Sequence, residues 1–192
     1  YEFTVEWGTS TTTDDREGDV IATSDVRPSP DHIRAVLPEF TGTILQKPPA
    51  FSAIKVDGKR AYDLARAGEE LDLAARPVEV YELDLVNQTE STATLRCVCG
   101  KGTYVRSLAR DIAEKLGTKG YVSYLCRENV GPFSLDHAIS LDFFRETTDK
   151  GNLESNVLPV QTVLDDIPVL AVNDTEATMS ESAKRINIIS RI

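Results

Sequence analysis

The sequence predicts an α+β fold in which helices flank a mixed, mostly antiparallel β-sheet. Residues 1–7 alternate strictly between apolar and polar side chains, which indicates a half-buried strand. Residues 78–86 and 92–99 have the composition of two further strands, and we expect them to pair antiparallel. Residues 104–116 repeat apolar side chains at helical spacing and are followed by Gly117, which is typical of a helix with one buried face.

The remaining predicted elements are shorter. A helix should begin after Ser29, whose hydroxyl can cap it while Pro30 occupies the first turn, and should end before Pro38. Elsewhere the pattern predicts a polar, Thr-rich loop over residues 8–19, a short helix over residues 59–67 closed by Gly68, and a strand over residues 121–127.

The pattern weakens after Asp142. We expect residues 1–150 to form part of one domain, residues 151–172 to be a linker that includes a short helix, and residues 173–192 to begin a second, incomplete unit. The sequence contains no internal repeat and no low-complexity tract.

Charge is distributed unevenly along the chain. The net charge of −10 argues against a nucleic-acid-binding protein when it is taken over the whole sequence. Residues 47–66, however, hold five basic side chains against two acidic ones, and residues 96–127 hold seven against two. A basic face on an acidic body suits RNA binding, and chance segregation of charge is the alternative.

The cysteine, histidine and apolar residues limit the class of protein. Three cysteines fit small, reduced core residues of a cytoplasmic protein. Only His32 and His137 could join them in a metal site, and neither has ligand spacing, so we expect no metal. No apolar run approaches the roughly 18 residues of a membrane helix, and we expect no membrane association.

One turn carries groups suited to nucleotide binding, and it reads Cys99-Gly100-Lys101-Gly102-Thr103-Tyr104-Val105-Arg106. The two glycines would let the backbone come close to a bulky group. Lys101, Tyr104 and Arg106 would supply a phosphate contact, a flat stacking surface and a fixed cation, which together suit a flipped nucleotide. Because many strand-to-helix turns hold glycines and a lysine, an ordinary surface turn is the alternative.

Three blocks of sequence, in this order and spacing, resemble a known family. They are Thr-Ser-Thr-Thr-Thr-Asp-Asp-Arg-Glu-Gly-Asp-Val over residues 9–20, Pro-Pro-Ala-Phe-Ser-Ala-Ile-Lys-Val-Asp-Gly-Lys-Arg-Ala-Tyr at the start of residues 48–66, and residues 101–106 followed by residues 120–127. Over residues 1–170 the chain resembles the bacterial TruB family of tRNA pseudouridine-55 synthases.

The resemblance implies the pseudouridine synthase fold and an isomerase activity. A uridine in the T-loop of tRNA is flipped out, an aspartate attacks, the glycosidic bond breaks, and the uracil is rejoined through carbon. The resemblance implies no cofactor and no metal. It further implies a cytoplasmic monomer whose partner is the T-arm stem-loop of tRNA.

Two residues match catalytic positions of the family. Tyr1 matches the tyrosine that packs on the target base and accepts a proton from its carbon, roles that suit a phenol. The alternative for Tyr1 is a core strand tyrosine. Arg106 matches the arginine that pairs with the catalytic aspartate, where a guanidinium would keep the carboxylate ionised and aimed. The alternative for Arg106 is a surface arginine on the first helical turn.

The resemblance also assigns binding residues. Tyr104 and Leu125 match pocket positions that line the uracil, and Lys101 lies beside them as a substrate contact. Lys55, Lys59 and Arg60 are candidates for contacts with RNA phosphates. A solvated surface charge is the alternative for each of these basic residues.

The nucleophile of the family is absent from the sequence. That aspartate lies in a Gly-x-Leu-Asp-Pro-x-Ala-Thr-Gly motif upstream of the strand at residues 1–7, and we do not assign its role to Asp14, Asp15 or Asp19. We therefore expect an N-terminally truncated chain that is inactive alone. Residues 173–192 would begin the family's C-terminal PUA-like RNA-binding domain. A non-catalytic module that binds or folds tRNA is the alternative function.

Overall fold

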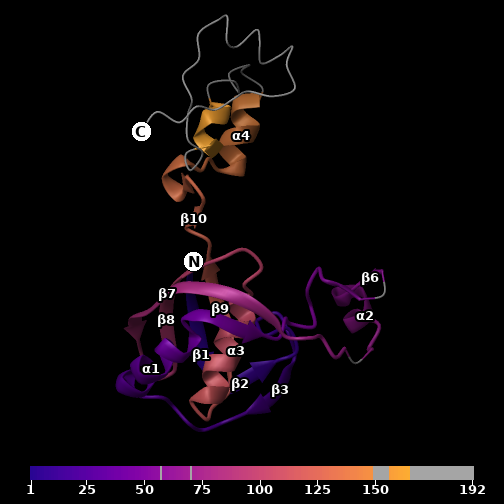
Figure 1. The fold of residues 1–192 in the computed structure, drawn as a ribbon, viewed down its shortest axis with the longest axis vertical. Helices are drawn as coiled ribbons and strands as arrows, with labels where there is room; N and C mark the ends of the chain where they lie inside the picture. Colours follow the sequence, from indigo (N-terminus) through magenta and orange to yellow (C-terminus); the bar gives the residue numbers. More distant parts are fainter. Residues whose placement is uncertain (57, 70, 149–155, 165–192) are drawn as a thin grey trace, which may run out of the picture. The chain divides into compact units, whose positions relative to one another are not determined.

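The structure is a computed structural model that describes residues 1–56, 58–69, 71–148 and 156–164 (Figure 1). The chain divides into two compact units, Tyr1–Asn129 and Val130–Ile192. Within the described residues, no helix has both the length and the apolar character needed to cross a bilayer.

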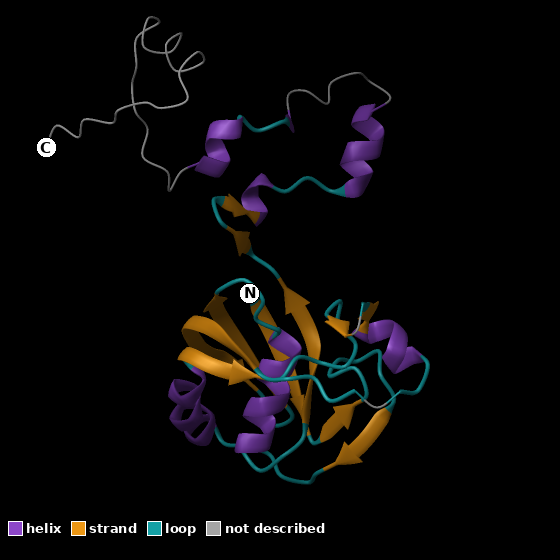
Figure 2. Cartoon of the chain, turned by 45° about the vertical axis from the view of Figure 1, so that its right-hand side comes forward, coloured by secondary structure: helices purple, strands orange, loops and turns teal. Residues whose placement is uncertain are grey.

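A five-stranded sheet is the centre of the first unit (Figure 2). Its strand order is β4-β7-β8-β1-β9, and each neighbouring pair is antiparallel, which confirms the predicted pairing. In this order the strands are β4 (Gly42–Gln46), β7 (Arg76–Gln88), β8 (Thr92–Cys99), β1 (Glu2–Trp7) and β9 (Gly120–Cys126).

One face of the sheet is buried. Along β1 the apolar side chains of Phe3, Val5 and Trp7 are buried, whereas the polar residues between them are partly exposed. β8 repeats the alternation, and Thr4 of β1 and Thr94 of β8 share a hydroxyl–hydroxyl hydrogen bond of 3.0 Å on the other face. The predicted half-buried strand at residues 1–7 is therefore confirmed.

Two helices pack against the sheet. α1 (Pro30–Val36) contacts β7, and α3 (Val105–Lys115) contacts β1 and β9. Ser29 caps α1 through a bond from the His32 amide, and α1 ends before Pro38, as predicted. A 3₁₀ helix that was not predicted, η1 (Leu37–Phe40), follows it directly.

The long amphipathic helix has the predicted composition and end. Leu108, Ala109 and Ile112 of α3 are fully buried in the core shared with the sheet. Gly117 adopts a φ of 72°, and the amides of Gly117 and Thr118 donate to the carbonyls of residues 114 and 113, which terminates the helix.

Gly120 allows α3 to lie unusually close to the sheet. A Cβ placed on Gly120 would lie 2.9 Å from both Ala113 Cβ and Val5 Cγ1, and 3.2 Å from the Trp7 ring. These atoms belong to the core, so a side chain at this position would force the helix and the sheet apart.

The structure differs from the predicted loop at residues 8–19. β2 (Thr9–Thr11) pairs antiparallel with β3 (Val20–Thr23), so the loop is confined to the turn between them. The prediction missed β2 because its residues are all polar. Thr is β-branched and fits a strand when a partner strand is available.

The segment between β4 and β7 is also more regular than expected. β5 (Lys55–Val56) pairs with β6 (Lys59–Arg60), and α2 (Ala61–Arg66) follows them. The predicted helix at residues 59–67 is therefore shorter at its start, because Lys59 and Arg60 belong to the hairpin. We call residues 47–75 the arm.

The second unit is described in part. The strand β10 (Asn129–Val130) spans the boundary between the units, and the described elements after it are β11 (Phe133–Ser134), η2 (Leu135–His137), α4 (Leu141–Thr148) and η4 (Val160–Leu164). Of the predicted linker at residues 151–172, only residues 156–164 are described, and they include η4. The predicted PUA-like start at residues 173–192 lies outside the described residues.

Candidate active site

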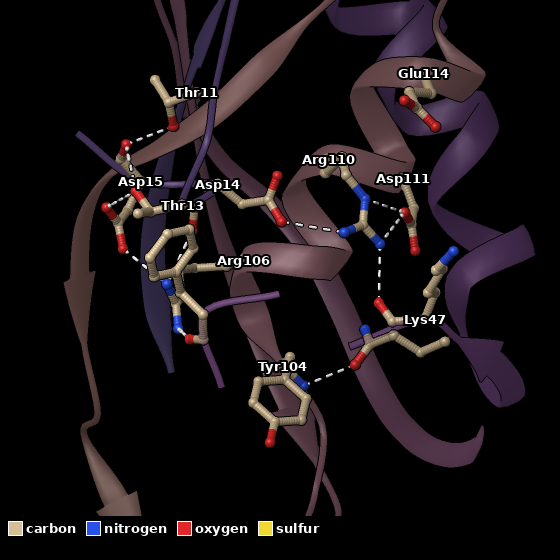
Figure 3. Close-up of polar contacts among 12 residues, drawn as sticks. Thr11, Thr13, Asp14, Asp15, Lys47, Tyr104, Arg106, Arg110, Asp111 and Glu114 are labelled. Atoms are coloured by element: carbon tan, nitrogen blue, oxygen red, sulfur yellow. Dashed lines mark hydrogen bonds and ion pairs between the residues drawn. The ribbon is translucent and has the colours of Figure 1, made fainter. Parts of the chain in front are cut away.

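Arg106 lies in the first turn of α3 and joins three parts of the chain (Figure 3). Its Nη1 donates to the Thr13 carbonyl at 2.8 Å and to Asp15 Oδ2 at 3.0 Å. Its Nη2 donates to the Phe51 carbonyl at 2.9 Å. A helix N-terminus disfavours a cation, and the Asp15 carboxylate compensates for that effect. The predicted alternative of a solvated surface arginine does not describe this side chain, which is 24% exposed.

Asp15 is held rigidly in the turn between β2 and β3. Its carboxylate accepts hydrogen bonds from the Thr13 hydroxyl and the Glu17 amide, and its carbonyl accepts one from the Thr11 hydroxyl at 2.6 Å. Its backbone also forms an isolated parallel bridge with Val122 of β9. These bonds orient the carboxylate toward α3.

Asp15 and Arg106 line an open pocket of about 340 Å³. Val122, Tyr124 and Leu125 of β9 supply its apolar wall, and Leu125 is 47% exposed. The structure thus brings together Arg106 and Leu125, two of the residues singled out in the sequence. An ion pair beside exposed apolar side chains can orient a planar polar ligand.

Tyr104 and Lys101 line a different hollow, of about 160 Å³. The Tyr104 amide donates to Gln46 Oε1 at 2.7 Å, and Arg76 and Gly102 complete that side of the hollow. Gln46 is 1% exposed, and its Nε2 has no hydrogen-bond partner among the described residues. The sequence suggested one pocket for Tyr104, Lys101 and Leu125, whereas the structure distributes them over two.

Tyr1 enters the sheet at the start of β1 and lies in neither hollow's lining. Its carbonyl accepts a hydrogen bond of 2.8 Å from the Cys97 amide of β8, and its side chain is partly buried against the core. Its role as a proton acceptor stays a prediction.

A second arginine, one helical turn beyond Arg106, forms a parallel network (Figure 3). Arg110 Nη1 donates to Asp14 Oδ2 at 3.0 Å, Nε donates to Asp111 Oδ1 at 2.9 Å, and Nη2 donates to the Lys47 carbonyl at 2.9 Å. Burial raises the pKa of the Asp14 carboxyl, and the charges of Arg110 and Arg106 oppose that effect. Burial likewise raises the pKa of Asp111, against the charge of Arg110.

Sequence reasoning missed Asp14, Asp15 and Arg110 as members of the site. Asp15 and Arg106 are 91 positions apart, and no local spacing relates them. The available signal was the pair of acids in a polar turn, opposite a helix whose two arginines are four residues apart and therefore share a face.

The arm presents its basic residues to solvent. Lys55, Lys59 and Arg60 are all exposed. The guanidiniums of Arg60 and Arg66 lie 5.8 and 5.5 Å from the centre of the Tyr62 ring, within cation–π range. Among the residues that the structure describes, no group of three or more His, Cys, Asp or Glu side chains could hold a metal.

Three curated relatives carry the name tRNA pseudouridine synthase B. The chain is 48% identical over 192 residues to the tRNA pseudouridine synthase B of Caulobacter vibrioides, 49% identical over 178 residues to that of Paracoccus denitrificans, and 51% identical over 183 residues to that of Bradyrhizobium diazoefficiens. These matches cover 100%, 93% and 92% of the chain. The chain spans only 62%, 59% and 53% of the respective relatives.

Solved structures share the fold. A Cbf5-Nop10-Gar1 complex matches with a TM-score of 0.61 at 23% identity, and an H/ACA RNP bound to a substrate RNA matches with a TM-score of 0.62 at 19% identity. Each match covers 95% of this chain, and 49% and 47% of the respective solved chain.

Two family models divide most of the chain between them. The model for the N-terminal domain of TruB family pseudouridylate synthases matches residues 1–105, and the model for the C-terminal domain of tRNA pseudouridylate synthase B matches residues 106–165. With a fold shared with Cbf5 and relatives near 50% identity, the chain belongs to the bacterial TruB family of pseudouridylate synthases.

Proposed function

We propose that the protein containing this chain is a tRNA pseudouridine synthase that isomerises a flipped-out T-loop uridine to pseudouridine. The relatives named above support the reaction and the substrate class. The observation that carries the proposal is the hydrogen bonding of the Arg106 guanidinium in the pocket beside β9. A guanidinium has five N–H donors, and three hydrogen bonds to described residues leave two for a carboxylate.

Those two donors suit a second carboxylate, the nucleophile. The family's Gly-x-Leu-Asp-Pro-x-Ala-Thr-Gly motif lies outside this sequence, and its aspartate would enter the pocket from a segment that precedes Tyr1. Arg106 would keep that carboxylate ionised against desolvation and fix its direction. Asp15 in turn would hold Arg106, because it fixes one side of the guanidinium while the other side faces the substrate.

The reaction then follows from the bonds that change. The aspartate carboxylate attacks C1′, the N1–C1′ bond breaks, and the uracil leaves as its N1 anion and rotates while the pocket retains it. C5 then attacks C1′, which breaks the aspartate–C1′ bond and releases the carboxylate. Tyr1 accepts the proton that C5 loses, and N1 takes up a proton from solvent. Leu125 would pack on the base from the pocket that Arg106 lines, and Tyr104 and Lys101 would contact the substrate from the second hollow. No cofactor and no metal take part in these steps.

The same proposal assigns the rest of the chain. Lys55, Lys59 and Arg60 of the arm would contact phosphates of the T-arm, and the protein would act as a cytoplasmic monomer. Residues 1–150 would be part of the catalytic domain, residues 151–172 a linker, and residues 173–192 the beginning of a PUA-like domain.

A tritium-release assay tests the proposal. Unmodified tRNA labelled at uracil C5 is incubated with the full-length protein, which includes the aspartate motif, and with the same protein carrying Asn in place of that aspartate. Release by the first protein alone supports the reaction. Tight tRNA binding by both proteins without release would favour the non-catalytic tRNA-binding module instead.

A further inference from the structure

Arg106 and Arg110 make matching contacts one helical turn apart. Arg106 holds the Phe51 carbonyl and the Asp15 carboxylate, and Arg110 holds the Lys47 carbonyl and the Asp14 carboxylate. Each arginine thus ties the start of the arm and the β2–β3 turn to α3. The pocket needs only Arg106 for its chemistry, which leaves Arg110 without a direct role.

Asp14 connects the second arginine to the first. It is the only non-glycine residue with a positive φ, 60°, among the described residues. Its amide donates to the Thr11 carbonyl, and its own carbonyl accepts a bond of 3.0 Å from the Val122 amide. Aspartate is one of the few residues that adopt this backbone region readily. The Arg110 guanidinium fixes the Asp14 carboxylate, and the direction of the next residue, Asp15, depends on the backbone conformation at Asp14.

The arm supplies a second connection between the two arginines. Lys47 and Phe51 are separated by Pro48, Pro49 and Ala50, and each proline ring fixes its own φ. The short segment is therefore stiff. A displacement of the Lys47 carbonyl, which Arg110 holds, is passed along it to the Phe51 carbonyl, which Arg106 holds.

We propose that Arg110 is a positioning residue: through Asp14 and the Lys47 carbonyl, it sets the orientation in which Arg106 meets the reacting carboxylate. The inference rests on the proposed function. Arg110 touches neither substrate nor nucleophile in this scheme, and its partial burial, at 22% exposed against 13% for Asp14, protects the pair from solvent screening.

Single-turnover kinetics with the full-length protein and tritiated tRNA separate a positioning role from a structural one. Arg110→Met should lower the rate constant at saturating protein on the order of tenfold, because small errors of alignment are costly in catalysis. The Kd for tRNA should change less than threefold.

The control variant lies on the same helix. Lys115→Met removes the 2.6 Å ion pair between Lys115 and Glu39, whose side chains are both about half exposed. This pair is not part of the contacts with the β2–β3 turn, so the rate should be unchanged. If Arg110→Met melts below the assay temperature, Arg110→Lys carries the test. It keeps the charge but cannot reach Asp14, Asp111 and the Lys47 carbonyl together, so its rate should fall at least threefold.

The outcomes are distinct. A rate loss confined to the Arg110 variants, with Kd preserved, supports the inference. Equal rates in the Arg110 and Lys115 variants, or a loss of tRNA binding at an unchanged rate, would overturn it. A wild-type protein that binds tRNA but releases no tritium would instead refute the proposed function.

Discussion

Replacing Arg106 with lysine tests the centre of the site. Lysine preserves the positive charge but offers a single ammonium instead of a planar fork. In the structure Arg106 already donates three hydrogen bonds, to Thr13, Asp15 and Phe51, and the proposed nucleophile needs two more donors. An ammonium has three donors in all, so it cannot serve the second carboxylate with two bonds while it also spans both carbonyls.

The magnitude follows from the bonds that are lost. A hydrogen bond to a charged group contributes about 1.5–3 kcal/mol. Loss of one bond to the reacting carboxylate, at about 2 kcal/mol, corresponds to a rate loss of about 30-fold. Freed carbonyls of Thr13 and Phe51 would add misalignment, so we expect at least this loss in Arg106→Lys, with the Kd for tRNA changed less than threefold.

Single-turnover tritium release and filter binding on the same preparations provide the measurement. The matched control is Arg34→Lys, because Arg34 is 61% exposed and, among the described residues, forms an ion pair only with Asp31 on the same helix. Melting temperatures of both variants exclude unfolding as the cause. A rate for Arg106→Lys within threefold of wild type would refute the reasoning. It would show that the rate depends neither on the paired donors of the guanidinium nor on their orientation.

Three further results are expected. Lys59→Ala combined with Lys101→Ala should weaken tRNA binding and flatten the slope of log Kd against log salt by about one unit per lysine; an unchanged slope would place both in solvent. Leu108→Ala, at a fully buried position, should lower the free energy of unfolding by about 2–5 kcal/mol in urea melts. The hydrogen bond from the Cys97 thiol lowers the pKa of Cys99 to about 6, so labelling of Cys99 by iodoacetamide should be half-maximal near pH 6. Cys97→Ala removes that bond and should raise the midpoint pH of labelling. A midpoint that does not change in Cys97→Ala would exclude the bond.

Periodicity was sufficient to predict the elements that have one buried face. The alternation at residues 1–7 and the stripe at residues 104–116 correspond directly to β1 and α3, because each buries its apolar side chains against the same core. β2, β3 and β4 were missed. Their strand character depends on a partner strand, β2 and β3 on each other and β4 on β7, and none of the three shows a clean alternation of burial.

Only those site residues that stand in a recognisable local sequence pattern were predictable. Arg106 stands in a recognisable turn, whereas Asp15 becomes a partner only when β9 and α3 bring the β2–β3 turn next to them. The distribution of Tyr104 and Leu125 over two hollows was equally hidden. Which hollow each side chain lines depends on the direction in which the backbone projects it, and spacing along the chain does not determine that direction.

The absent side chain at Gly120 connects the core to the chemistry of the pocket. A methyl group there would push on Ala113, which lies on the same rigid helix as Arg110 and Arg106. A library that varies position 120 would therefore distinguish two sets of substitutions: those with which the protein still folds, and the smaller set with which it is still active. The difference between those two sets would measure how accurately the pocket must be placed, at a position that is itself buried.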